Sequence, residues 1–146
     1  MKSAQATDRI DYTKPFKENV QGRLKAQFRV DSDGTPMYQP HDEDPRLRVY
    51  TIDVFLATPR TKEIKRVKYY MDDDSYVDPD GYSDDADNEF REEITSYGDV
   101  EIVVTVEMSN HKKYEQRAWL SNMLENGHAD EMTPAIRAAI QRIKVN

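Results

Sequence analysis

The chain has 146 residues and a mass of 17.0 kDa, enough for one decorated domain and too little for two. Charged residues make up 34% and hydrophobic residues 37%, against about 25% and 45–50% in average globular proteins, so part of the chain lies outside a core. The absence of cysteine excludes a disulfide scaffold, a thiol nucleophile and a cysteine-ligated metal. No apolar run reaches the roughly 18 residues of a membrane span, and no signal segment is recognised, so we expect a cytoplasmic protein.

The formal net charge of -7 is concentrated in one segment. Residues 72–89 hold eight Asp, one Glu and no Lys or Arg, which leaves the rest of the chain close to neutral. Nucleic-acid binding needs a basic stripe, which this sequence lacks, and we exclude nucleic acid as a partner. The carboxylates could ligate a hard cation such as calcium, but they lack the spacing of an EF-hand. A solvated, mobile acidic loop without a metal is the favoured interpretation.

The first part of the chain combines a polar leader with a strand and a turn. Residues 1–21 show no sustained hydrophobic period and are expected to form a flexible leader. Residues 24–30 alternate strictly between apolar and polar side chains, as in a half-buried strand. Asp and Gly in 31–34 predict a turn, and the three prolines of 35–45 predict a short return stretch and then a loop.

The middle of the chain predicts further strands. Apolar residues alternate in 46–57 and again in 63–71, and the break between these runs predicts that they pair as an antiparallel hairpin. Residues 90–95 fit a strand or a helical turn equally well. The cleanest alternation, in 100–108, predicts a core strand. A turn leads from it into a last predicted strand, residues 114–123.

The end of the chain changes to a helical period. Thr133 and Pro134 place a capping hydroxyl before a proline at the first helical position. Four apolar residues follow at helical spacing and form one stripe: Ile136, Ala139, Ile140 and Ile143. We expect a short helix that docks on its own sheet or on a partner.

Short strands with regular turn signals and one helix indicate an all-β fold, an antiparallel β-sandwich with a short C-terminal α-helix. We divide the chain into the leader (1–21), a β-sandwich domain (22–126) and a C-terminal helical segment (127–146). The inward faces of the expected strands carry the side chains that should be buried: Ile52, Val54, Val67, Tyr69, Ile102, Val104, Val106 and Leu120.

Two loops of this sandwich carry a pattern similar to that of a known family. A strand with the residues Ile-Lys-Arg-Val-Lys-Tyr-Tyr-Met (64–71) is followed by Ser-Tyr at 75–76. After a variable loop, Ser-Tyr-Gly at 96–98 opens a long strand. In this order and spacing the chain resembles the YEATS domain, and its prokaryotic relatives more closely than the eukaryotic ones. The resemblance covers residues 49–124.

The resemblance implies an immunoglobulin-like sandwich that serves as a non-catalytic recognition module. Eukaryotic members hold the flat acyl group of an acylated lysine between aromatic rings from these two loops, and prokaryotic members are regarded as sensors in signalling and defence systems. The family histidine would fall near Asp72 or Asp73, where this chain has none. We therefore expect weak binding or a different ligand, and the anionic rim suits a cationic one. The ligand-binding residues implied by the resemblance are Ser75, Tyr76, Ser96, Tyr97 and Gly98.

The sequence offers no arrangement typical of catalysis. The three histidines, His41, His111 and His128, lie in separate predicted turns or loops. No G-x-S-x-G elbow or glycine-rich phosphate loop is present. We therefore predict a non-enzyme without a cofactor, whose partner is a modified protein or a small-molecule ligand and not a membrane.

A structural or assembly protein, of a phage or accessory type, is the alternative interpretation; it would bind partners through the N-terminal arm and the terminal helix. An exposed Trp119 would be typical of such an interface, although a half-covered ring packed under the C-terminal helix or the N-terminal arm is favoured. Two tyrosines separate the interpretations. Tyr76 and Tyr97 should converge on one pocket in a recognition module and lie far apart otherwise. The sequence does not predict the oligomeric state.

Overall fold

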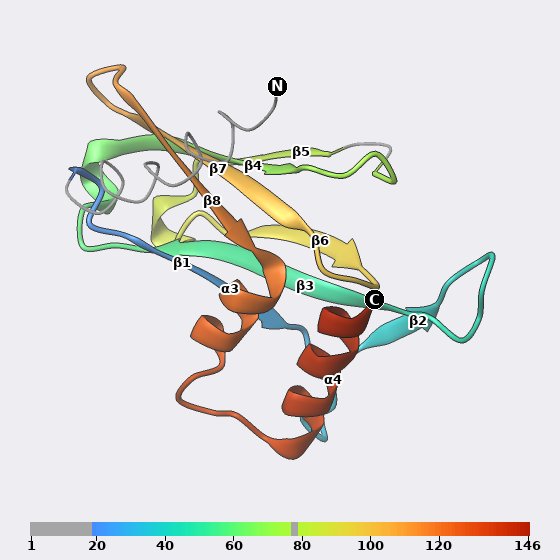
Figure 1. Cartoon of the computed structure of the whole chain (residues 1–146). Helices are drawn as coiled ribbons and strands as arrows, with labels where there is room; N and C mark the ends of the chain where they lie inside the picture. Colours follow the sequence, from blue (N-terminus) through green and yellow to red (C-terminus); the bar gives the residue numbers. More distant parts are fainter. Residues whose placement is uncertain (1–18, 77–78) are drawn as a thin grey trace.

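The computed structural model describes residues 19–76 and 79–146, which form two antiparallel sheets packed face to face, with two short α-helices at one side (Figure 1). The chain is an all-β sandwich, as the alternating runs predict. Residues 1–18, most of the expected leader, lie outside the described residues. Val20 at its end is fully buried, and the Thr58 hydroxyl donates a hydrogen bond to the Val20 carbonyl at 2.8 Å.

The first sheet is built around β3 (Arg48–Ala57). β1 (Arg23–Phe28) and the short β2 (Tyr38–Pro40) pair with the two halves of β3, and β6 (Glu92–Ser96) also pairs with it. The ambiguous segment before Ser96 is therefore a strand. One edge of this sheet is β1 and the opposite edge is β6.

The second sheet has the strand order β5-β4-β7-β8. Its strands are β4 (Ile64–Met71), β5 (Asp80–Ser83), β7 (Glu101–Met108) and β8 (Lys113–Trp119). β7 carries the cleanest alternation in the sequence and occupies a central position, because its apolar side chains can face the first sheet along its whole length.

The core lies between the two sheets and consists of the side chains that the period of two places inward. All eight residues expected to be buried are fully buried, which confirms that part of the prediction. Phe90 is also fully buried, although both Glu89 and Phe90 adopt left-handed backbone conformations. The Tyr69 hydroxyl donates a hydrogen bond to the Phe90 carbonyl at 2.8 Å, and burial raises the pKa of this phenol.

The predicted hairpin between 46–57 and 63–71 is wrong. β3 and β4 belong to different sheets, and the connection with the short 3-10 helix η1 (Thr61–Glu63) crosses from one sheet to the other. The alternating pattern showed correctly which side chains face inward. It could not tell whether two neighbouring strands pair edge to edge or stack across the core, because both arrangements bury the same residues.

The predicted last strand is too long. β8 ends at Trp119, and α3 (Leu120–Gly127) follows instead of further strand. Leu120, Met123 and Leu124 are fully buried at helical spacing. The carboxylate of Asp99 accepts hydrogen bonds from the Ser121 backbone N–H at 2.9 Å and from its hydroxyl at 2.6 Å, so a distant loop caps the first turn of this helix.

The expected C-terminal helix is α4 (Pro134–Val145). Thr133 caps it, because its hydroxyl oxygen accepts a hydrogen bond from the Ile136 N–H at 3.2 Å, and Pro134 occupies the first turn. The whole apolar stripe of the helix is buried within the molecule. The helix therefore docks on its own fold, which was one of the two expected outcomes.

Part of the acidic segment 72–89, expected to be a loop, forms regular secondary structure. Residues 80–83 form β5, which pairs with β4, and a 3-10 helix η2 (Ala86–Asn88) follows. Gly81 and Ser83 are buried. Residues 77 and 78 lie outside the described part, and the mobility of the segment stays a prediction. Only Asp80 of the acidic side chains lies in the edge strand β5, and the others described lie in the turns around it or in η2.

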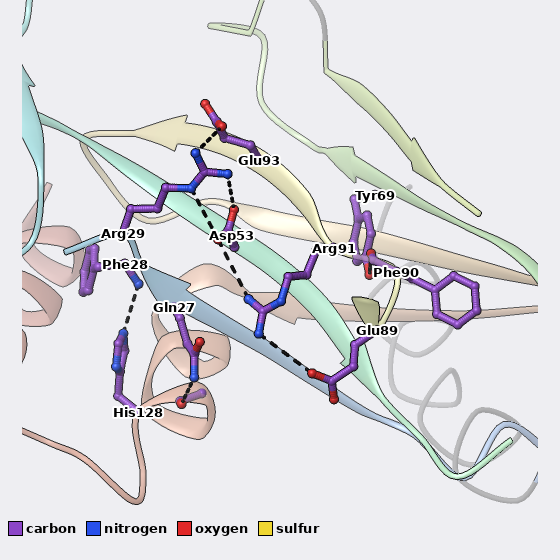
Figure 2. Close-up of polar contacts among 11 residues, drawn as sticks. Gln27, Phe28, Arg29, Asp53, Tyr69, Glu89, Phe90, Arg91, Glu93 and His128 are labelled. Atoms are coloured by element: carbon purple, nitrogen blue, oxygen red, sulfur yellow. Dashed lines mark hydrogen bonds and ion pairs between the residues drawn. The ribbon is translucent and has the colours of Figure 1, made fainter. Parts of the chain in front are cut away.

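The helix α3 covers the free edge of β1 (Figure 1). Figure 2 shows two of the locking contacts: the Gln27 amide donates to the Gly127 carbonyl at 2.8 Å, and the Phe28 N–H donates to His128 Nε2 at 3.0 Å. The His128 ring also stacks on Phe28 with ring centroids 5.7 Å apart. The orphan backbone groups of an edge strand thereby find partners inside the molecule.

Trp119 is half-covered, as expected, because 47% of the residue is exposed. Packing under the N-terminal arm stays a prediction, since residues 1–18 lie outside the described residues. Trp119 ends β8 opposite Glu101, on the outward face of the second sheet, since Ala118 and Leu120 point to the core.

Candidate functional site

A cleft of about 720 Å³ opens at the end of the sandwich where β4 and β6 end and β7 begins. All five residues that the resemblance implies as ligand-binding line it: Ser75, Tyr76, Ser96, Tyr97 and Gly98. They come from two loops that are separated along the chain and brought together by the sandwich. The expected convergence of Tyr76 and Tyr97 on one pocket is therefore met, whereas ligand binding itself stays a prediction.

Tyr76 forms the partly buried wall of the cleft. It packs against the hydrophobic core, and burial raises the pKa of its phenol. A hydrogen bond with the Ser96 side chain acts in the opposite direction on this pKa. The ring thus has a fixed apolar body and a polar tip directed at the neighbouring strand, which is how amphipathic aromatic residues serve binding sites.

Tyr97 meets a histidine in the cleft. The rings of Tyr97 and His41 lie edge to face, with centroids 5.1 Å apart and planes at 78°. Among the ring contacts of residues 19–76 and 79–146, Tyr97 pairs with His41 and not with Tyr76, so the two tyrosines do not stack face to face. Tyr76 and the Tyr97–His41 pair all line the cleft.

Sequence reasoning missed His41, because it follows β2 and lies far along the chain from both loops. Its Nδ1 accepts hydrogen bonds from the backbone N–H groups of Glu43 at 3.1 Å and Asp44 at 3.3 Å. A neutral ring held in this way carries its proton on Nε2. The cleft therefore contains a histidine, although not at the family position near Asp72.

Ser75 is exposed and forms hydrogen bonds with Asp73 of the same turn. Its N–H donates to Asp73 Oδ1 at 2.8 Å. Hydrogen bonds from the backbone and the side chain of Ser75 lower the pKa of the Asp73 carboxyl. Ser75 thus holds the loop in shape, and its hydroxyl would have to exchange partners to donate to a ligand.

Ser96 and Gly98 form the floor of the cleft. The Ser96 hydroxyl donates to the Gly98 carbonyl at 2.7 Å, and both residues are buried. A Cβ atom at Gly98 would lie 2.7 Å from the backbone carbon of Asn146, which also lines the cleft. Glycine is needed here because the end of α4 packs directly against this loop.

A second cavity of about 240 Å³ adjoins the first along the side of the sandwich where β5 and β6 meet. Tyr76 and Thr95 line both cavities. Glu92 lies in the second cavity and packs so closely that a Cβ at Gly81 would be 2.7 Å from its Oε2. Burial and the neighbouring Glu93 raise the pKa of the Glu92 carboxyl.

Carboxylates dominate the charge of this region. The first cavity is lined by Glu43, Asp73 and Asp99 and the second by Asp80, Glu92 and Glu93, and no Lys or Arg lines either one in the described part of the chain. No group of three or more His, Cys, Asp or Glu side chains among the described residues is arranged to hold a metal ion. The arrangement can bind through aromatic faces and negative charge.

The known protein families and the curated proteins contain no match to this sequence. None of the helices in the described residues has the length and apolar content to cross a membrane.

Proposed function

We propose that the chain is a non-catalytic recognition module with an immunoglobulin-like sandwich of the YEATS type, close to the prokaryotic members, working in cytoplasmic signalling or defence. Its cleft would bind a modified side chain or a small ligand between the two loops. The observation that carries the proposal is that Tyr76 and Tyr97, singled out in two separate loops from the sequence, line one cleft.

The cleft provides the elements that such recognition needs. Tyr76 and the Tyr97–His41 pair provide aromatic walls with few rotatable bonds, so little side-chain entropy is lost on binding. Aromatic contacts of about 1 kcal/mol each, together with one or two hydrogen bonds, give micromolar to millimolar affinity for a small site.

The second candidate is a structural or assembly protein, and one observation favours it. Trp119 is 47% exposed on the outer face of the second sheet, and exposed tryptophan is typical of interfaces. The buried stripe of α4 speaks against an assembly role for that helix, because its apolar side chains are already used within the fold.

The test is a calorimetric titration with lysine peptides, unmodified and acylated. We expect binding by the wild-type protein and loss of binding in Tyr97→Ala and Tyr76→Ala, because each variant removes one wall of the cleft. Tyr82→Ala is the matched control, since Tyr82 is 53% exposed on β5 and lines neither cavity of the cleft. It should bind like the wild type.

The melting temperature of each variant is measured alongside its titration. If Tyr76→Ala and Tyr97→Ala unfold the protein, these tyrosines are core residues and the proposal fails. If all peptides bind equally well to the cleft variants and the wild type, the site lies elsewhere.

A further inference from the structure

The cleft continues beyond Tyr76. Tyr76 and Thr95 are shared by the large cavity at the end of the sandwich and the smaller cavity along its side. The smaller cavity lies between the β5 and β6 edges, which approach each other without pairing as strands. A slender chain could therefore enter the large cavity, pass along the Tyr76 ring and end in the smaller one.

Glu92 lines the smaller cavity and not the large one. The alternating pattern of β6 directs it inward with Ile94 and Ser96, although most inward positions are apolar. Its neighbours have partners: Glu93 pairs with Arg29 at 2.9 Å, and Asp80 pairs with Lys68 at 3.6 Å. Glu92 forms no ion pair with any residue in the described ranges. A partly buried carboxylate without a cation is costly, and a bound cation would remove that cost.

We propose that the site selects an alkylammonium group, with the ammonium at Glu92 and the unbranched alkyl stem along the Tyr76 ring. The inference rests on the proposed function, because it uses the same cleft. An apolar ring face accommodates methylene groups and attracts the adjacent positive charge. The Tyr76 ring, which lines both cavities, gives the alkyl stem an aromatic surface in addition to the carboxylates.

We expect the site to prefer an unmodified, charged lysine side chain to an acylated one, which is the opposite of the preference of acyl-lysine readers. Acylation removes the charge of a lysine side chain and enlarges its end, so an acylated group would lose the interaction with Glu92. It would also leave the carboxylate without a partner. The alkylammonium can come from a lysine side chain of a protein or from a free diamine, and both present the same chemistry to the cleft.

The experiment is an NMR titration at low salt with a matched pair of probes. Nα-acetyl-lysine methylamide carries a free ammonium, and the same compound acetylated at Nζ is neutral. Cadaverine is the free diamine. We expect the charged lysine compound to bind at least about tenfold more tightly than its acetylated form, which is the ratio that about 1.4 kcal/mol provides. Tighter binding of cadaverine would identify a free diamine as the source, and tighter binding of the lysine compound would identify a protein side chain.

Two variants, each of which removes one negative charge, test whether the preference for the charged probe depends on Glu92. Glu92→Gln should remove the preference for the charged probe. Asp87→Asn, an exposed position in η2 that lines neither cavity, should retain it. If the acetylated probe binds more tightly, or if Glu92→Gln keeps the preference, the alkylammonium inference is overturned while the cleft remains the binding site. If Tyr76→Ala binds every probe as the wild type does, the proposed function fails as well.

Discussion

The two sides of the sandwich, where the edges of the sheets come together, are built in opposite ways. On one side α3 follows β8 and covers β1, with Gly127 so close that a Cβ there would lie 1.9 Å from the Ala26 carbonyl oxygen. On the other side β5 and β6 approach each other around a cavity that contains the Glu92 carboxylate. The first side is closed by backbone and ring contacts, and the second is left open.

The difference indicates where function can reside. On the closed side, as Figure 2 shows, the Phe28 N–H of the edge strand donates to His128, and the Gln27 side chain donates to the carbonyl of Gly127 at the end of α3. The open side keeps a polar cavity and an inward carboxylate at the cost of stability, which is common in functional sites. Changes on the closed side should therefore affect folding, and changes on the open side should affect binding.

Gly127→Ala should cause the largest loss of stability. The added methyl group meets the β1 backbone at Ala26, which cannot move without separating from β3. We expect a loss of about 3 kcal/mol in the free energy of unfolding, although alanine is the better helix former. Urea denaturation measures this change. Unchanged stability would show that α3 does not pack against β1 as described.

Lowering the pH should destabilise the closed side, because His128 becomes protonated. Its neutral Nε2 accepts the Phe28 N–H, and burial lowers the pKa of its imidazole, partly opposed by Glu131. The unfolded chain then binds more protons, so the stability that His128 contributes is full above the unfolded pKa of about 6.5 and is lost as the pH falls through the folded value. His128→Gln should remove this part of the pH dependence.

The exposed His111 provides the control for this prediction. His111→Gln should retain the wild-type pH profile in urea denaturation between pH 5 and pH 8. Identical profiles for His128→Gln and the wild type would contradict the role of the buried ring.

Glu92→Gln should change the stability less than the two preceding variants do, and it should increase it. Because burial and Glu93 raise the pKa of Glu92, the folded state binds more protons than the unfolded state over that range, and stability falls as the pH rises through it. Removing the charge should therefore raise the melting temperature slightly at neutral pH. A lower melting temperature would show that the carboxylate stabilises the fold, and the open side would then be a structural feature.

The period of two predicted most of the core, because burial of one strand face is a local property of the sequence. Tyr69, Ile102 and Val104 were placed inward for this reason and are fully buried. The predicted pairing of β3 with β4 is wrong because the choice of a pairing partner is not a local property of the sequence. The start of α3 was missed because its capping residue, Asp99, lies in another loop.

The candidate site could be predicted only in part. Tyr76 and Tyr97 were found through a resemblance in order and spacing, and the fold brings them to one cleft. His41 and Glu92 were missed because neither has a local signal: one follows a three-residue strand, and the other begins β6 shortly after the acidic segment, where carboxylates are common. Their placement depends on how the strands pack.

Amide chemical shifts recorded during a titration with a lysine peptide show which part of the protein binds the ligand. We expect the shifted resonances to cluster in residues 73–76 and 92–98, at the two cavities, while the resonances of α3 and β1 do not shift. Shifts centred on Trp119 or on the contact between α3 and β1, with the open side unaffected, would contradict this expectation.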